Sequence, residues 1–219
     1  MAHDSSRLPI ALAGLLLLAP PSLAHGQSSE PEDISFQRPT PTEARAETDV
    51  SDALRTRQTI ADVHRGFGIA TWIAMTGTLV MGFIHLSDEY GFFAAQPDTP
   101  CARGNAVFQD FCTGPAIPHA IAGFTTLALY GTTFGLSFAM PDPLGVGDAE
   151  GAFSDRLRVH KVLRWVHLAG MVLQTAIGIA ISFMDTNDYD TRRALAGVHL
   201  GTGLVTWGAL TTAAALVIF

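Results

Sequence analysis

Four long apolar stretches constrain the fold of this chain more than any other feature. They cover residues 66–86, 116–140, 162–184 and 194–219, and each has about 20 residues or more, the length of a helix that crosses the hydrocarbon core of a bilayer. Each also contains several Gly, Ala, Thr or Ser residues, which let helices approach closely in lipid. With short connections between them, the stretches predict an all-α protein, a compact antiparallel four-helix transmembrane bundle.

The composition favours a membrane location and excludes several functions. Of the 219 residues, 48% are hydrophobic and 15% are charged, so polar side chains are too few to cover a soluble globule of this length. The net charge of -7 lies mainly in residues 30–52 and 88–110. A nucleic-acid partner is excluded, because phosphate binding needs a basic face. The sequence also contains no Walker motif, dinucleotide-binding GxGxxG after a strand, HExxH or nucleophile elbow.

The amino-terminal region is predicted to be processed or disordered. Residues 1–24 contain Arg7, an apolar run over 8–19 and the small-residue pattern Ser22-Leu23-Ala24, which indicate a secretory signal peptide and a bacterial-type inner membrane. The alternative is an uncleaved fifth helix, although the apolar run is short and ends at a Pro-Pro pair. Residues 25–50 are predicted to be a disordered linker, residues 51–63 an amphipathic lead-in, and residues 64–219 the bundle.

Two sequence rules disagree about the orientation in the membrane. A cleaved signal peptide places residues 27–63 in the periplasm and the loop that carries Cys101 and Cys112 in the cytoplasm. Basic side chains near the helix ends number seven on the amino-terminal side and three on the other, and the richer side is normally cytoplasmic. The two cysteines would form a disulfide in a periplasmic loop and remain thiols in a cytoplasmic one. We follow the signal peptide.

Six histidines lie within or at the edge of the predicted spans, where an ionisable side chain is costly and is a functional candidate. Three lie near one membrane face and three near the other, so two separate sites are available; they are His64, His160 and His167, and His85, His119 and His199. We expect His85, beside Ser87 and Asp88 at a helix end, to be an interfacial or hydrogen-bonded histidine.

A haem iron can be held by two imidazoles from facing helices at matching depth. Glycine follows four residues after His64, His119 and His199, at Gly68, Gly123 and Gly203, on the same helix face and with space for a flat macrocycle. His160 and His167 compete as the ligand from the third span. Membrane depth and the nearby Gly170 favour His167. The chain lacks a CxxCH attachment motif, so two non-covalent b haems are expected.

At these histidines the chain resembles the core of the cytochrome b561 superfamily, in a form without a DOMON domain. The resemblance covers residues 63–207 and rests on loose motifs. They are His64 with Trp72, His119, His160-Lys161-Val162-Leu163 with Gln174 and Gly178, and Arg192-Arg193 before His199. Two departures are Arg164, where the family usually has glycine, and the long loop at 85–118.

The resemblance implies transmembrane electron transfer by two haems, ligated by His64 with His160 and by His119 with His199. It therefore favours His160 over His167. Electron donor and acceptor proteins or a quinone would be the partners, together with membrane lipid. Two alternatives stay open: a quinone-reactive haem anchor subunit of a larger oxidoreductase, and a non-haem transport or structural subunit. A permease normally has acidic or histidine residues in mid-span, and the central portions of these spans have almost none.

Overall fold

The computed structural model describes residues 40–112, 114–185 and 187–218. Every regular element in these ranges is a helix. The four long ones are α1 (Pro41–Tyr90), α3 (Ile117–Ala139), α4 (Ala152–Phe183) and α5 (Tyr189–Ile218). The loop after α1 holds three short ones, η1 (Gln96–Asp98), α2 (Pro100–Arg103) and η2 (Gln109–Phe111). The predicted signal peptide and residues 25–39 of the predicted linker lie outside the described residues.

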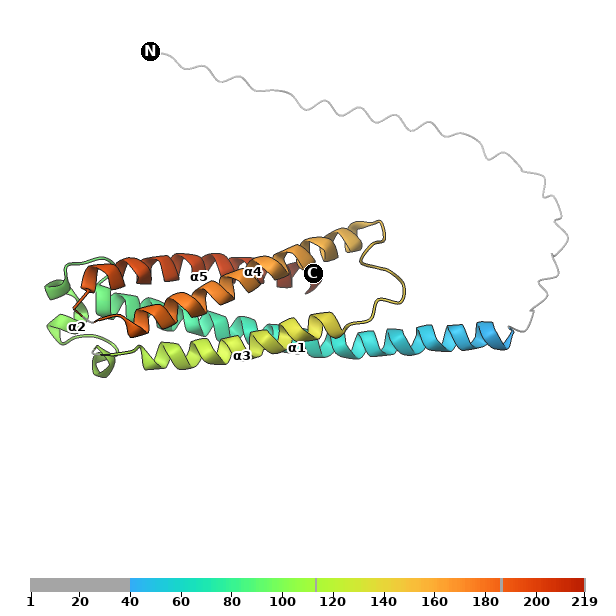
Figure 1. Cartoon of the computed structure of the whole chain (residues 1–219), viewed down its shortest axis with the longest axis horizontal. Coiled ribbons are helices and arrows are strands. Elements are labelled where there is room, and N and C mark those ends of the chain that lie inside the picture. The colour runs from blue at the N-terminus through green and yellow to red at the C-terminus, as the bar shows by residue number, and fades with distance from the viewer. Residues whose placement is uncertain (1–39, 113, 186, 219) are drawn as a thin grey trace, which may run out of the picture. The chain divides into compact units, whose positions relative to one another are not determined.

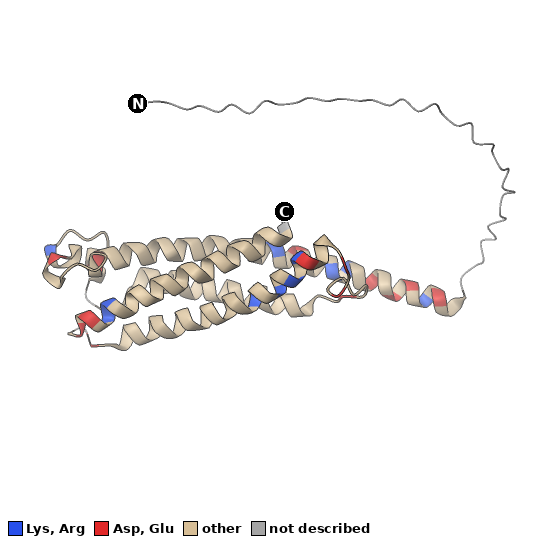
Figure 2. Ribbon diagram, turned by 90° about the horizontal axis from the view of Figure 1, so that it is seen from above, with Lys and Arg blue, Asp and Glu red and all other residues tan. Residues whose placement is uncertain are grey.

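The four long helices lie side by side and are each long and apolar enough to cross a membrane (Figure 1). Many large apolar side chains on them are exposed, among them Ile73, Val205 and Phe183 at 61%, 67% and 88%, which suits a surface covered by lipid. Charged residues lie mainly toward the two ends of the bundle (Figure 2). The predicted fold class is confirmed, and the chain is a multi-pass membrane protein.

Helix α1 starts earlier than the sequence analysis predicted. It begins at Pro41, inside the expected linker, because Thr40 and Glu43 form a reciprocal cap. The Thr40 side chain accepts a hydrogen bond from the Glu43 backbone, and the Glu43 carboxylate accepts one from the Thr40 backbone. Residues 41–56, which we call the stalk, extend past the other helices (Figure 1). The linker prediction over 25–50 is therefore wrong for residues 41–50.

The bundle consists of two helix pairs, α1 with α3 and α4 with α5, and α1 also packs against α5. Hydroxyl groups join the first pair at two depths: Thr71 lies 3.1 Å from Thr133, and Thr78 lies 2.8 Å from Thr126, measured between their side-chain oxygens. Such hydrogen bonds strengthen helix association in lipid. The centre of the bundle is closed by a buried cluster of Met75, Tyr130, Met171 and Leu210.

The loop between α1 and α3 is held by a covalent and a polar contact. Cys101 and Cys112 form a disulfide with their Cα atoms 5.5 Å apart, so the loop contains the bond that the sequence analysis left open. The buried carboxylate of Asp88 accepts hydrogen bonds from the backbone nitrogens of Val107 and Phe108, at 3.0 and 2.9 Å. We call this end of the bundle the disulfide face.

Candidate functional site

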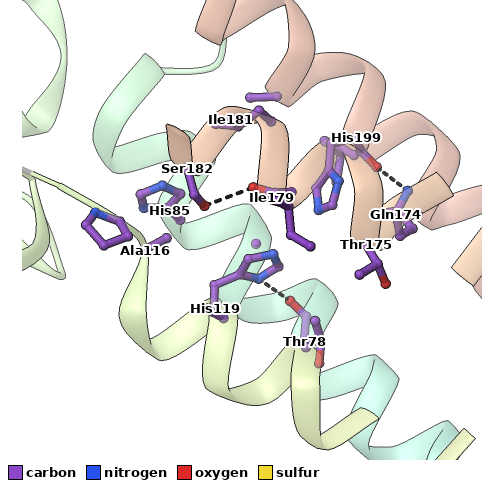
Figure 3. A pocket seen from close by; sticks show the side chains of 18 of the residues that line it. Thr78, His85, Ala116, His119, Gln174, Thr175, Ile179, Ile181, Ser182 and His199 are labelled. Atoms are coloured by element: carbon purple, nitrogen blue, oxygen red, sulfur yellow. Dashed lines mark hydrogen bonds between the residues drawn. The ribbon is translucent and has the colours of Figure 1, made fainter. Parts of the chain in front are cut away.

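Near the disulfide face, His119 from α3 and His199 from α5 lie opposite each other. Their ring centroids are 5.9 Å apart and their planes make an angle of 83° (Figure 3). The two rings come from different helix pairs, since α3 packs with α1 and α4 packs with α5. The pair therefore bridges the two halves of the bundle.

A second histidine pair lies toward the stalk. His64 from α1 and His160 from α4 have ring centroids 6.4 Å apart and an interplanar angle of 78°. Again one ring comes from each helix pair. The structure thus brings together four of the five predicted site residues in the two pairs that the family resemblance implied.

Hydrogen bonds fix the orientation of three of these rings. Nδ1 lies 2.9 Å from the Thr133 carbonyl oxygen in His64, 3.1 Å from that of Thr78 in His119, and 2.8 Å from that of Ala213 in His160. A carbonyl can only accept, so each Nδ1 carries the proton and each Nε2 has a free lone pair. Metal-binding histidines typically donate their other ring N–H to a carbonyl or carboxylate in this way.

His199 differs from the other three rings. Its Nδ1 is buried and has no hydrogen-bond partner among the described residues. Its backbone carbonyl instead accepts a hydrogen bond from the Gln174 amide, at 2.8 Å, and the same amide contacts the Thr202 hydroxyl. Gln174 therefore contacts the helix backbone at His199 and not the imidazole ring.

The separation of the rings suits a shared metal ion. An imidazole nitrogen binds a transition-metal ion at about 2 Å, so two rings that share one ion have centroids roughly 6 Å apart. The observed separations are 5.9 and 6.4 Å. Two imidazoles supply only the axial ligands of a six-coordinate iron, and a macrocycle would supply the other four. The described residues contain no group of three or more His, Cys, Asp or Glu side chains placed to hold a bare ion.

A cavity of about 420 Å³ adjoins the His119–His199 pair and is lined by all four long helices. Two glycines open it beside the histidines. A Cβ atom at Gly82 on α1 would lie 3.1 Å from Cε1 of His119, and one at Gly178 on α4 would lie 3.4 Å from Cε1 of His199. Its walls are mainly apolar, as in most cofactor sites. The residues at this pair therefore fit a flat, apolar, iron-containing group.

The sequence analysis identified some of the glycines that matter and missed others. Gly123 and Gly203, each four residues after a histidine, do line the cavity. The glycines in closest contact with the rings, Gly82 and Gly178, lie on the facing helices. No spacing rule within one helix could find them, although Gly178 was already part of the family resemblance.

His167 has a different environment from the four paired histidines. It is buried, at 6% exposure, and its Nδ1 lies 2.9 Å from the Tyr130 hydroxyl, with the two rings perpendicular. Tyr130 belongs to the central buried cluster. The structure therefore pairs His160, and not His167, with His64, and it places His167 in a packing and hydrogen-bonding role.

An ionic network lies at the outer end of the cavity. The Glu89 carboxylate lies 2.8 Å from Nε2 of His85 and 2.9 Å from the Arg192 guanidinium. Figure 3 shows His85 at the edge of the pocket, away from the space between His119 and His199. His85 therefore lies at the edge of the cavity beside the Glu89 carboxylate. The Tyr90 hydroxyl and Nε of Arg192 are buried here and have no hydrogen-bond partner among the described residues.

Comparisons with protein-family models, curated proteins and solved structures find no match to this chain.

Proposed function

We propose that the chain is a transmembrane electron-transfer protein that binds two b haems, one at His119–His199 and one at His64–His160. The observation that carries this proposal is the repeated pairing of histidines from opposite halves of the bundle, with Nδ1 bonded to a carbonyl in three of the four rings. A bound haem would supply a one-electron couple at each site.

The spacing of the two sites supports transfer across the membrane. Along α1, His64 marks one site and Gly82, which adjoins His119, marks the other. Eighteen residues of helix separate them, which is about 27 Å at the rise of an α-helix. Along α5, His199 and the Ala213 carbonyl that His160 contacts are about 21 Å apart on the same basis. Since the hydrocarbon core is about 30 Å thick, the sites would lie near opposite faces.

The residues of this chain would orient the imidazoles, exclude water and set the local charge. The carbonyls of Thr78, Thr133 and Ala213 hold three rings through Nδ1 and leave the Nε2 atoms of these rings available to a bound iron. The central cluster of Met75, Tyr130, Met171 and Leu210 separates the sites with apolar side chains. These contacts and the local charges would set each reduction potential. The cytochrome b561 resemblance implies the same pairs and the same function.

The test is the haem content of the detergent-purified chain, expressed with ample haem supply. The pyridine haemochrome assay is expected to give about two haems per chain, with a reduced-minus-oxidised spectrum of low-spin b haem. His119→Ala and His199→Ala each lose one haem, whereas the matched control His85→Ala retains both. A chain that contains no haem would contradict electron transfer and would favour the transport or structural alternative.

We also propose an orientation in a bacterial-type inner membrane. The Cys101–Cys112 disulfide is suited to an oxidising compartment, and the stalk side carries seven of the ten basic residues near the helix ends, as cytoplasmic sides do. Both features support a periplasmic disulfide face and a cytoplasmic stalk. This orientation is the reverse of the one that the predicted signal peptide implied.

A further inference from the structure

Arg164 places a cation in the wall of the His64–His160 site. It lies on α4, four residues after His160, or about 6 Å along the helix axis. Its guanidinium lies 4.4 Å from the ring centroid of Phe138 and 5.1 Å from that of Trp165, and it donates to the Ser137 hydroxyl at 3.2 Å. These contacts hold the side chain against the bundle and limit its movement toward solvent.

The charge of Arg164 is not balanced by a carboxylate. Its Nε is buried without a hydrogen-bond partner, and none of the salt bridges between described residues includes it. Asp142, at the same end of the bundle, pairs instead with Arg57 at 3.3 Å. Arg164 therefore adds one fixed positive charge at this site, because a guanidinium stays protonated in proteins. Lys161, the residue after His160, is a further cation at this end. It lies with Arg57 near Asp142.

The His119–His199 site has the opposite charge balance. Asp88 and Glu89 lie between the cavity-lining residues Leu86 and Tyr90 of α1, and Asp88 is only 3% exposed. Arg192, which lines the cavity, pairs with Glu89 at 2.9 Å. The carboxylates of Asp88 and Glu89 and the guanidinium of Arg192 together carry one net negative charge.

Fixed charges act strongly on a redox centre inside a membrane, because the low dielectric screens them weakly. Reduction adds an electron, so a nearby cation favours the reduced state and a nearby anion favours the oxidised state. Each site would hold the same haem between two imidazoles, and the haem would carry the same carboxylates of its own at both sites. A difference in the surrounding protein charges would therefore move the two potentials apart.

From this asymmetry we infer that Arg164 makes His64–His160 the site of higher potential, so that electrons pass from the disulfide face toward the stalk. The inference rests on the proposed function and adds its direction. It also gives a role to Arg164, the residue at which the chain departs from the glycine usual in the family it resembles.

The experiment is a potentiometric titration of the purified, haem-loaded chain, with optical detection. Arg164→Gln is expected to lower the higher midpoint by at least the equivalent of a tenfold change in equilibrium constant, which is about 59 mV for a one-electron couple. Arg164→Lys keeps the charge and is expected to retain the wild-type midpoint. Arg65→Gln is the matched control, since Arg65 is at the same end but exposed and paired with Asp62; it leaves both midpoints unchanged.

Two single-site variants test the inference without changing Arg164. The haem left in His199→Ala, at His64–His160, is expected to have a higher midpoint than the haem left in His64→Ala. The reverse order would overturn the inference, as would unchanged midpoints in Arg164→Gln or equal losses in Arg164→Gln and Arg164→Lys. A chain without haem would contradict the proposed function itself, whereas a haem-loaded chain with unmoved midpoints contradicts only the inferred direction.

Discussion

A Cβ atom at Gly82 would lie 3.1 Å from Cε1 of His119, although the two residues belong to different helices. His119 also contacts α1 through Nδ1, 3.1 Å from the Thr78 carbonyl oxygen. Thr78 and Gly82 are one helical turn apart. One turn of α1 therefore contacts the His119 ring on two sides, and a methyl group at position 82 would displace the ring.

Gly82→Ala is accordingly predicted to lower haem occupancy at His119–His199. The added methyl group forces the ring away from α1, and the other site is unaffected, so haem content falls from about two per chain toward one. The haemochrome assay measures the change. Gly77→Ala is the matched control on the same helix, because a Cβ atom there meets nothing within 4 Å. Full occupancy in Gly82→Ala would show that the ring can move without loss of binding.

His160→Ala is predicted to remove the haem on the stalk side, whereas His167→Ala retains both haems. His160 faces His64, while His167 is bonded to Tyr130. Loss of the His167 ring leaves the buried Tyr130 hydroxyl unpaired, which costs about 1–3 kcal/mol. Thermal unfolding and haem content of the two variants separate the roles. Loss of haem from His167→Ala alone would assign the ligand to the deeper histidine.

The stability of the loop between α3 and α4 is predicted to fall in acid. Hydrogen bonds from the Gly147 and Val146 backbone nitrogens, with the nearby charges of Arg57 and Lys161, hold the pKa of Asp142 below its usual value. Because its pKa is lowered in the folded state, Asp142 stabilises the fold at pH values above the ordinary Asp pKa of about 3.9. This stabilisation is lost as the pH falls through the lower pKa of the folded state. Because Asp142 is partly exposed, we expect about 1 kcal/mol or less.

Asp142→Asn tests this dependence through thermal unfolding in detergent between pH 3 and pH 7, taken as roughly the range over which an Asp carboxyl titrates. The variant is expected to be less stable than the wild type at pH 7 and to lose less stability on acidification. Asp148→Asn provides the control, since Asp148 lies in the same loop and is exposed. Parallel curves for wild type and Asp142→Asn would show that the loop does not depend on this carboxylate.

The orientation can be measured with single cysteines in a Cys101→Ser, Cys112→Ser background. Val107 lies in the disulfide-closed loop and is 72% exposed, and Thr48 is exposed on the stalk. In bacterial spheroplasts, a membrane-impermeant maleimide is expected to label Val107→Cys, and to label Thr48→Cys only after lysis. The opposite pattern would support the orientation that the signal peptide implied.

The fold was predictable because span length and composition are local properties of the sequence. Within the described residues, each of the four predicted stretches follows one long helix and extends at most one residue past its ends. The start of α1 was not predicted because the capping pair of Thr40 and Glu43 lies in a polar segment. The composition of that segment is typical of disordered chains. Ser- and Pro-rich composition reports how much surface a segment can bury, not whether a cap begins a helix within it.

The pairing of the histidines was only partly predictable. Sorting by membrane side allowed His64 with either His160 or His167, because both lie on one face of the same helix. The packing of Tyr130 against His167 decides between them, and a partner on another helix leaves no periodic signal near either histidine. The contacts of Gly82 and Arg164 could not be predicted either, because both residues also have partners on other helices.

The division of the bundle into two helix pairs has a consequence for biogenesis. The first half of the chain, with α1 and α3, contains His64 and His119, and the second half, with α4 and α5, contains His160 and His199. A nascent chain that has integrated only its first half therefore presents two single imidazoles at different depths and neither pair. The His64–His160 pair needs α4 and the His119–His199 pair needs α5, so capture of a cofactor at His119–His199 would report insertion of the last helix.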